Sequence, residues 1–260
     1  DFGVWSLMTD ALLILARIVL FVAVLAPVGL AIYKAVRSPA VRAILKRNVA
    51  SYFSGVLGYL FIIVFVVGAA AAAFMPEFFT SNESTLDYLT RWLPLMLVFL
   101  APAITMSTWA EERKQGTSEL LFTLPATDLD VLLAKYLSVV TVYTTALVFS
   151  APVPLFLEYI GDPDCGLIAT NYFGYWLTGV SLLAAGMFAS ALTSSVTVAF
   201  VLGAAICAVP VLLGYVVSTN SLFASLTIPE QLRDFGLGVV PLTSLLYFAS
   251  LSIFMLYLNL

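Results

Sequence analysis

Residues 109–130, which read WAEERKQGTSELLFTLPATDLD, form a strongly charged stretch between two long apolar runs. Four charged side chains follow one another near its start, at positions 111–114. A charged side chain costs about 3 kcal/mol at the centre of a lipid bilayer. The sequence therefore predicts that these four side chains stand in water and that the stretch connects two membrane spans.

The middle of this stretch predicts a turn followed by a short helix on the membrane surface. Gly116 suits the left-handed conformation that ends the preceding helix, and Thr117 suits the cap of a new one. Glu119 would lie near the positive end of the new helix dipole. Leu120 and Leu121 would be among the apolar contacts of this helix. These signals together predict a short, stiff element held between two spans.

The end of the stretch predicts where the short helix stops and where the next span begins. Pro125 blocks continuation of the helix because it lacks a backbone N–H. Thr127, with Asp130 three residues later, has the spacing of a capping box, with Asp in place of the usual Glu. On these grounds alone the stretch is either a well-capped loop or a surface that a partner protein grips, and both interpretations stay open.

The composition predicts an all-α polytopic membrane protein. Hydrophobic residues make up 62% of the 260-residue chain and charged residues 10%. Several apolar runs reach the roughly 20 residues that an α-helix needs to cross a bilayer. Histidine is absent, and the two cysteines, Cys165 and Cys207, fall in a predicted loop and in an apolar run. We therefore expect no disulfide and no metal site.

The apolar runs predict one additional N-terminal transmembrane helix followed by a core of six spans. The additional helix lies in a segment at 1–37, a distinct helix follows at 38–57, and the core occupies 58–260. The six predicted core spans are 59–74, 92–110, 131–157, 172–192, 196–217 and 239–258.

Residues 38–57 have the pattern of an amphipathic interfacial helix. Ser38 and Pro39 suit its first turn, and apolar residues recur at helical spacing along one face. The opposite face is basic and carries Arg42, Lys46 and Arg47. We expect this helix to lie on membrane lipid at the cytoplasmic surface. The alternative is a helix that covers neighbouring spans.

Lysine and arginine residues predict the orientation of the spans. If the spans alternate as above, eight of these residues fall on the side of the charged stretch. Two, Arg91 and Arg233, fall on the opposite side, with Arg17 set aside inside the first span. Basic residues are enriched in cytoplasmic loops, so the charged stretch is predicted to face the cytoplasm.

Several chemistries lack the residues that they require. The sequence has no G-x-x-x-x-G-K-[ST] phosphate loop, so we do not expect this chain to hydrolyse ATP by itself. The apolar runs carry almost no acidic residues, which weighs against an ion-coupled carrier. No nucleophile has a histidine base. Small residues such as Gly179, Gly186 and Ala189 predict close helix packing, with substrate lining as the alternative.

The charged stretch also resembles a segment of a known protein family. The motif is Trp109-Ala-Glu-Glu-Arg, then Gly116-Thr-x-Glu119-Leu-Leu-x-Thr-Leu-Pro125, then Lys135. It resembles the cytoplasmic coupling segment of ABC-2 type transporter permeases, most nearly in the branch related to gliding-motility permeases. Ser107 departs from that pattern, because a basic residue is expected after Met106 in the family.

The resemblance covers roughly residues 40–260. It implies a six-span permease core with a coupling helix at about 111–125 that docks on a separate ATPase subunit. The residues that it assigns to this docking are Glu111, Glu112, Arg113, Lys114, Gly116, Thr117, Glu119, Leu120, Leu121 and Pro125.

The resemblance further implies a non-catalytic subunit of the bacterial-type inner membrane that couples ATP hydrolysis to export or extraction of a substrate. No cofactor would bind this chain, because ATP and Mg would be held by the partner ATPase subunits. The other implied partners are a second permease copy or a homologue, a large extracytoplasmic domain protein and membrane lipid, with no nucleic acid. Two interpretations from other classes stay open: an ion-coupled carrier or channel, and a non-transporting membrane anchor of a larger complex.

Overall fold

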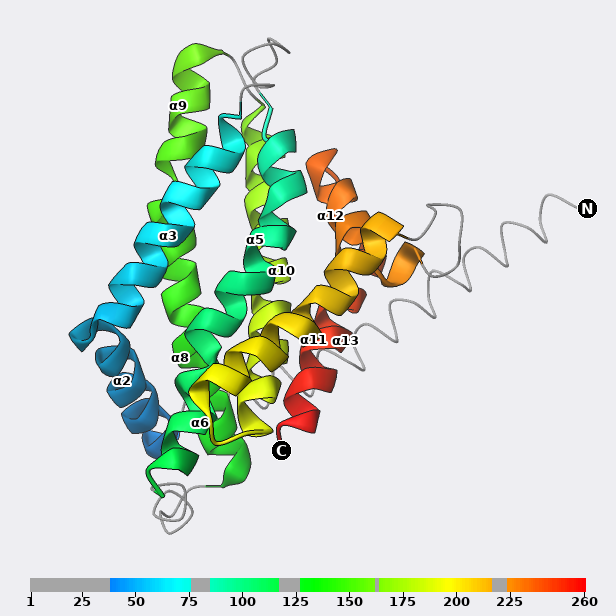
Figure 1. Ribbon diagram of the computed structural model, residues 1–260. Coiled ribbons are helices and arrows are strands. Elements are labelled where there is room, and N and C mark those ends of the chain that lie inside the picture. Colours follow the sequence, from blue (N-terminus) through cyan, green and yellow to red (C-terminus); the bar gives the residue numbers. More distant parts are fainter. Residues whose placement is uncertain (1–37, 76–84, 117–126, 162–163, 217–223) are drawn as a thin grey trace, which may run out of the picture.

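The computed structural model describes residues 38–75, 85–116, 127–161, 164–216 and 224–260, and all regular structure within them is helical (Figure 1). The helices are α2 (Pro39–Ser54), α3 (Val56–Ala73), α5 (Asp87–Thr105), α6 (Ser107–Lys114), α8 (Asp128–Phe149), α9 (Pro152–Ile160), α10 (Cys165–Ala191), α11 (Val196–Val216), α12 (Ile228–Gly236) and α13 (Leu242–Leu258), with a 3-10 turn at Ala224–Leu226. The predicted additional helix in 1–37 lies outside the described residues.

Each of the six predicted core spans corresponds to helical structure. Among the described residues, five helical segments are long and apolar enough to cross a membrane: Val56–Ala73, Asp87–Lys114, Asp128–Ile160, Cys165–Ala191 and Val196–Val216. The sixth, Leu242–Leu258, is apolar but has 17 residues. The prediction of an all-α polytopic membrane protein is confirmed.

Two of the ranges that were predicted as single spans contain breaks. The second span changes from α5 to α6 at Met106, and the third changes from α8 to α9 at 150–151. The second break lies directly before Pro152, which has no backbone N–H to continue the helical hydrogen bonds, although Ala151 itself keeps helical backbone angles. The first break has no proline at the junction, and its hydrogen bonds are described below.

The centre of the bundle is α10, which packs against α5, α8, α11, α12 and α13. Small residues allow close approach there, as predicted from the sequence. A Cβ atom added at Gly179 would lie 2.1 Å from Cζ of Tyr143 on α8. The Tyr143 hydroxyl group donates a hydrogen bond of 2.7 Å to the backbone carbonyl of Tyr175 on α10. The contact between α8 and α10 therefore depends on a glycine that leaves room for a buried tyrosine.

The two ends of the bundle carry different elements (Figure 1). Helices α2 and α6 lie at one end, which we call the inner end, and α9 and α12 lie at the other, which we call the outer end. The basic residues of α2 and α6 belong to the inner end, whereas Arg91 and Arg233 line a pocket at the outer end. This separation agrees with the alternation of spans from which the orientation was predicted.

Candidate functional site

The inner end joins α2, α6 and the start of α8. Val41 and Ile44 of α2 are buried against Val131 and Ala134 of α8, and Trp109 of α6 packs at the edge of this cluster. The apolar face of α2 therefore covers a neighbouring span rather than resting on lipid alone. This is the alternative that the sequence analysis left open.

The opposite face of α2 is exposed, as its pattern predicts. It presents Arg42, Lys46 and Arg47 to the surroundings. Pro39 occupies the first turn of the helix as expected, but the Ser38 side chain makes no capping hydrogen bond. The exposed basic face and the buried apolar face together fix how α2 is rotated about its axis.

Lys135 of α8 is the most deeply buried charged group of the inner end, with a relative exposure of 2%. Its Nζ atom donates to the backbone carbonyl of Thr108 at 2.6 Å and lies 2.5 Å from a carboxylate oxygen of Glu112. The same ammonium group lies 4.1 Å from the centre of the Trp109 ring. A buried cation is tolerated only when partners of this kind replace its water shell.

Glu112 of α6 forms ion pairs with two other helices. One carboxylate oxygen meets Lys135 of α8, and the other lies 3.9 Å from a guanidinium nitrogen of Arg47 on α2. Its side chain is 23% exposed, whereas Glu111, Arg113 and Lys114 are exposed. The expectation that all four charges stand in water is thus wrong for Glu112, because α8 supplies a buried countercharge.

Both predicted boundaries of the segment at 117–126 have the expected geometry. Gly116 has φ of +67° and ends the helical path from α6. Thr127 accepts a hydrogen bond from the backbone N–H of Asp130, and the Asp130 carboxylate accepts one from the N–H of Thr127, both at 3.3 Å. This reciprocal pair is the capping box that the sequence predicted, and it begins α8.

The segment between these boundaries lies outside the described residues. Its predicted docking residues are Thr117, Glu119, Leu120, Leu121 and Pro125. The structure therefore places Glu111, Glu112, Arg113, Lys114 and Gly116 of the predicted docking set, and the role of the whole set stays a prediction. Sequence reasoning missed the pairing of Glu112 with Lys135, because the two residues are 23 positions apart.

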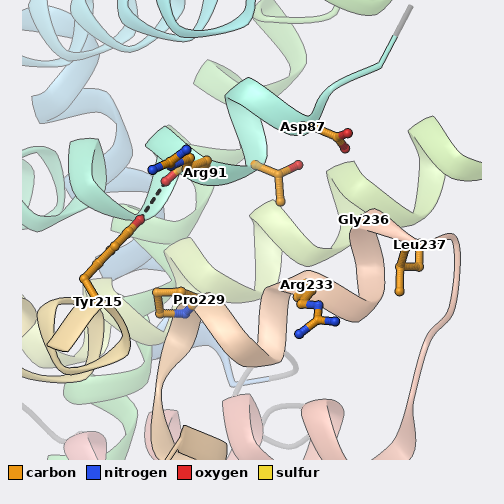
Figure 2. Close-up of a pocket in the computed structure, with 8 residues that line it drawn as sticks. Asp87, Arg91, Tyr215, Pro229, Arg233, Gly236 and Leu237 are labelled. Carbon is orange, nitrogen blue, oxygen red and sulfur yellow. Dashed lines mark hydrogen bonds between the residues drawn. The ribbon is translucent and has the colours of Figure 1, made fainter. Parts of the chain in front are cut away.

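A pocket of about 290 Å³ opens at the outer end. It is lined by Asp87, Thr90, Arg91, Tyr215, Pro229, Arg233, Gly236 and Leu237. Figure 2 shows that Arg91 and Arg233 project from different helices and that the Tyr215 hydroxyl group reaches the backbone carbonyl of Arg91, at 2.8 Å. Arg233 lies 3.6 Å from Glu230, one turn earlier on α12.

This pocket is lined by charged side chains, but these do not have the geometry of an acid–base catalytic site. Both arginine side chains are exposed, and the single carboxylate of the lining, Asp87, is exposed as well. General acid–base catalysis needs a positioned proton donor or acceptor within hydrogen-bond reach of another reacting group. Within the described ranges, no group of three His, Cys, Asp or Glu side chains could hold a metal ion.

Comparison with known protein families matches residues 70–255, well over half of the chain, to a family described as "ABC-2 family transporter protein". A search among curated proteins returns no match. The family match does not separate branches, so the resemblance to gliding-motility permeases stays a prediction. Members of the family are transmembrane subunits that associate with ABC ATPases. Because of this match, the chain belongs to the ABC-2 transporter family, and together with its apolar helices the match shows that it is a multi-pass membrane permease of an ABC transporter.

Proposed function

We propose that this chain couples ATP hydrolysis by separate ATPase subunits to the export or extraction of a substrate across a bacterial-type inner membrane. ATP and Mg would bind to the partner subunits and not to this chain. The observation that carries the proposal is the ion-paired junction of Glu112, Lys135 and Arg47. It holds α2, α6 and α8 together, and α6 and α8 are the helices before and after the segment at 117–126 in the sequence, which is the predicted docking element.

The charged residues of α6 fall into two groups, one that binds neighbouring helices and one that is exposed and could bind a partner. Glu112 faces inward and ties α6 to α8, whereas Glu111, Arg113 and Lys114 are exposed beside Gly116. Exposed charges can pair with a partner surface without first breaking a buried contact. We propose that these three side chains, together with the predicted docking residues of 117–126, contact the ATPase.

The path of movement follows from the boundaries of the docking segment. On one side it joins α6, which continues into α5, and on the other side it joins α8 through the capping box at Thr127. A push on the segment by a closing ATPase dimer would therefore act on the second and third core spans together. The ion pair between α6 and α8 would make these two spans move as one unit.

The proposal includes further partners. A second copy of this chain or a homologue would complete the membrane pathway, and the branch resemblance adds a large extracytoplasmic domain protein. The exposed basic face of α2 would contact anionic lipid headgroups through Arg42, Lys46 and Arg47. Each basic side chain contributes about 1 kcal/mol to binding near such a surface.

The direct test is copurification of the full chain with candidate ABC ATPase subunits, followed by measurement of ATP hydrolysis by the complex. The combined variant Glu111→Arg and Arg113→Glu reverses two exposed charges and leaves Glu112 in place. We expect it to weaken copurification while the thermal stability of the isolated chain stays unchanged. Arg233→Gln, an exposed substitution at the outer end, is the matched control and should copurify normally.

The same experiment separates the proposed function from its rivals. Unchanged binding and unchanged ATP hydrolysis in the charge-reversal variant would contradict the docking assignment. Ion-driven transport by this chain alone, reconstituted in vesicles without an ATPase, would favour a carrier or channel. Binding of an ATPase whose turnover is the same with and without this chain would favour a membrane anchor.

A further inference from the structure

The junction between α5 and α6 is held by a side chain from a third helix. The helical path that begins at Asp87 is interrupted at Met106, and α6 starts at Ser107. The hydroxyl oxygen of Ser190, on α10, accepts hydrogen bonds from the backbone N–H groups of Trp109 and Ala110 at 3.0 and 3.1 Å. The same hydroxyl group donates to the Met106 carbonyl at 2.9 Å. Ser190 thereby binds the backbone at the break and in the first turn of α6.

Two other helices bind the backbone of the same junction. The Tyr52 hydroxyl group of α2 donates to the Ile104 carbonyl at 3.2 Å. Burial raises the pKa of Tyr52, so this hydroxyl group keeps its proton at neutral pH. Lys135 of α8 donates to the Thr108 carbonyl at 2.6 Å. Three carbonyl groups around the break are therefore bound by side chains from three different helices.

The membrane side of the junction is closely packed. A Cβ atom added at Gly186 of α10 would lie 2.3 Å from Oγ1 of Thr105, and one added at Gly203 of α11 would lie 2.9 Å from Cβ of Pro102. The last turn of α5 is thus enclosed by α10 and α11. On the other side of Met106, α6 carries the exposed charges at 111, 113 and 114. The break therefore lies between α5, which is closely packed in the bundle, and α6, which in the proposed function contacts the ATPase.

Ser190 differs from the other two side chains in what it connects. Tyr52 belongs to α2 at the inner end and Lys135 to the first turns of α8, whereas Ser190 belongs to α10, which runs through the centre of the bundle and contacts six other described helices. Ser190 itself is fully buried, with a relative exposure of 0%. A side chain that binds backbone groups across an interruption in a helix sets the angle at that interruption.

We infer that Ser190 is a positioning residue for coupling: its hydroxyl group sets the angle of α6 on α5 and joins α6 to the central helix α10. This inference rests on the proposed function, in which α6 receives the movement of the ATPase. Without the hydroxyl group, the Met106 carbonyl and two N–H groups of α6 lose their shared partner. The ion pair at Glu112 remains, so α6 stays attached but its angle is less defined.

Spin labels on the full chain in lipid nanodiscs test the geometry without any ATPase. The labels are attached at Gln115→Cys and Ser194→Cys, two exposed positions beside α6 and at the α10–α11 turn. The exposed Cys165 is first replaced by Ser, whereas Cys207 is buried. We expect a single narrow distance distribution in the parent and a broader one in Ser190→Ala.

Ser181→Ala is the matched control for this measurement. Ser181 is also a fully buried serine of α10, and its hydroxyl group donates to the Phe248 carbonyl of α13, far from α6. Both variants lose a buried hydroxyl group, so both should lower the melting temperature by a similar amount. Only Ser190→Ala should broaden the distance distribution. Equal distributions in the two variants would overturn the inference.

The second measurement uses the complex with its ATPase. Mutations in a coupling network change coupling by factors of about 2 to 30, and we expect Ser190→Ala to reduce the effect of the permease on ATP turnover within this range. Binding of the ATPase should be retained. Ser190→Thr, which keeps a hydroxyl group, should restore the parent response, whereas Ser181→Ala should not differ from the parent.

The outcomes separate failure of this inference from failure of the proposed function. Absence of any ATPase binding by the parent chain contradicts the proposed function, while the label distances still test the junction. Full coupling in Ser190→Ala overturns the inference alone. If Ser190→Ala does not accumulate in membranes, Ser190→Cys replaces it in the ATPase assay, because a thiol has a similar size but forms weaker hydrogen bonds. Full coupling in that variant would equally overturn the inference.

Discussion

The inner and outer ends of the bundle each contain an ion pair, but the two pairs differ in what they hold together. At the inner end Lys135 and Glu112 join α8 to α6, with Lys135 2% exposed. At the outer end Arg233 and Glu230 lie on the same short helix, with side chains 64% and 35% exposed. Solvent-exposed pairs contribute about 0–1 kcal/mol, whereas removing one partner of a buried pair costs about 3–5 kcal/mol.

This contrast indicates that the helices of the inner end are held together more firmly than those of the outer end. The inner pair links residues that come from different helices and adds backbone and aromatic contacts to the same ammonium group. The outer pair neighbours a pocket whose charged lining residues are exposed. We expect substitutions to have large effects at the inner end and small effects at the outer end.

The largest effect should come from Lys135→Met. The methionine side chain fills similar space but leaves the Glu112 carboxylate and the Thr108 carbonyl without their ammonium partner. We expect a loss of about 3 kcal/mol in the free energy of unfolding, measured by thermal unfolding in detergent micelles. The double variant with Glu112→Gln should recover part of this loss, because the carboxylate is also removed. A melting temperature equal to that of the parent would contradict the assignment of a structural ion pair.

Glu112→Gln should have the next largest effect. The amide keeps the shape of the side chain and one hydrogen-bond acceptor, but the buried Lys135 loses its countercharge. We expect a cost of about 2 kcal/mol, because hydrogen bonds to charged groups contribute about 1.5–3 kcal/mol. The control is Glu111→Gln on the exposed face, which should leave the unfolding temperature within error of the parent. Equal effects of the two substitutions would show that Glu112 does not hold α6 to α8.

Two glycines in the left-handed region sharpen the comparison. Gly116 at the inner end has φ of +67°, Gly238 at the outer end has φ of +77°, and neither has a neighbouring atom within 4 Å of an added Cβ atom. Gly116→Ala and Gly238→Ala should each cost about 1–2 kcal/mol through backbone strain alone. Under the proposed function, only Gly116→Ala should also lower copurification with the ATPase. Loss of copurification in both variants would point to general destabilisation instead.

The smallest effect should come from Arg233→Gln. The Arg233 side chain is 64% exposed and its partner Glu230 lies on the same helix, so the pair contributes about 0.3–0.5 kcal/mol at most. We expect no measurable change in melting temperature at physiological salt, and a small change at low salt where screening is weaker. A loss comparable to that of Glu112→Gln would remove the contrast between the two ends.

Much of the fold could be predicted because the relevant signals are local. The length of an apolar run is set by the thickness of the bilayer, and the described helices follow the six predicted core spans. The ends of the charged stretch were predicted for the same reason. Gly116 and the Thr127–Asp130 capping box depend on residues at most three positions apart. The break at Met106 was missed, because hydrophobicity does not show whether a helix bends, whereas the break before Pro152 has a local signal in the proline itself.

By itself the sequence determined that this chain crosses a membrane several times, roughly where its apolar spans lie, and which stretch is too charged to enter the bilayer. The tertiary structure decided that Glu112 turns inward to Lys135 and that Ser190 binds the start of α6 across 81 residues of sequence. The physical reason is the separation in sequence over which each interaction acts. Hydrophobicity and capping act over one span or one turn, whereas a buried ion pair or an inserted hydroxyl group exists only after packing has brought distant helices into contact.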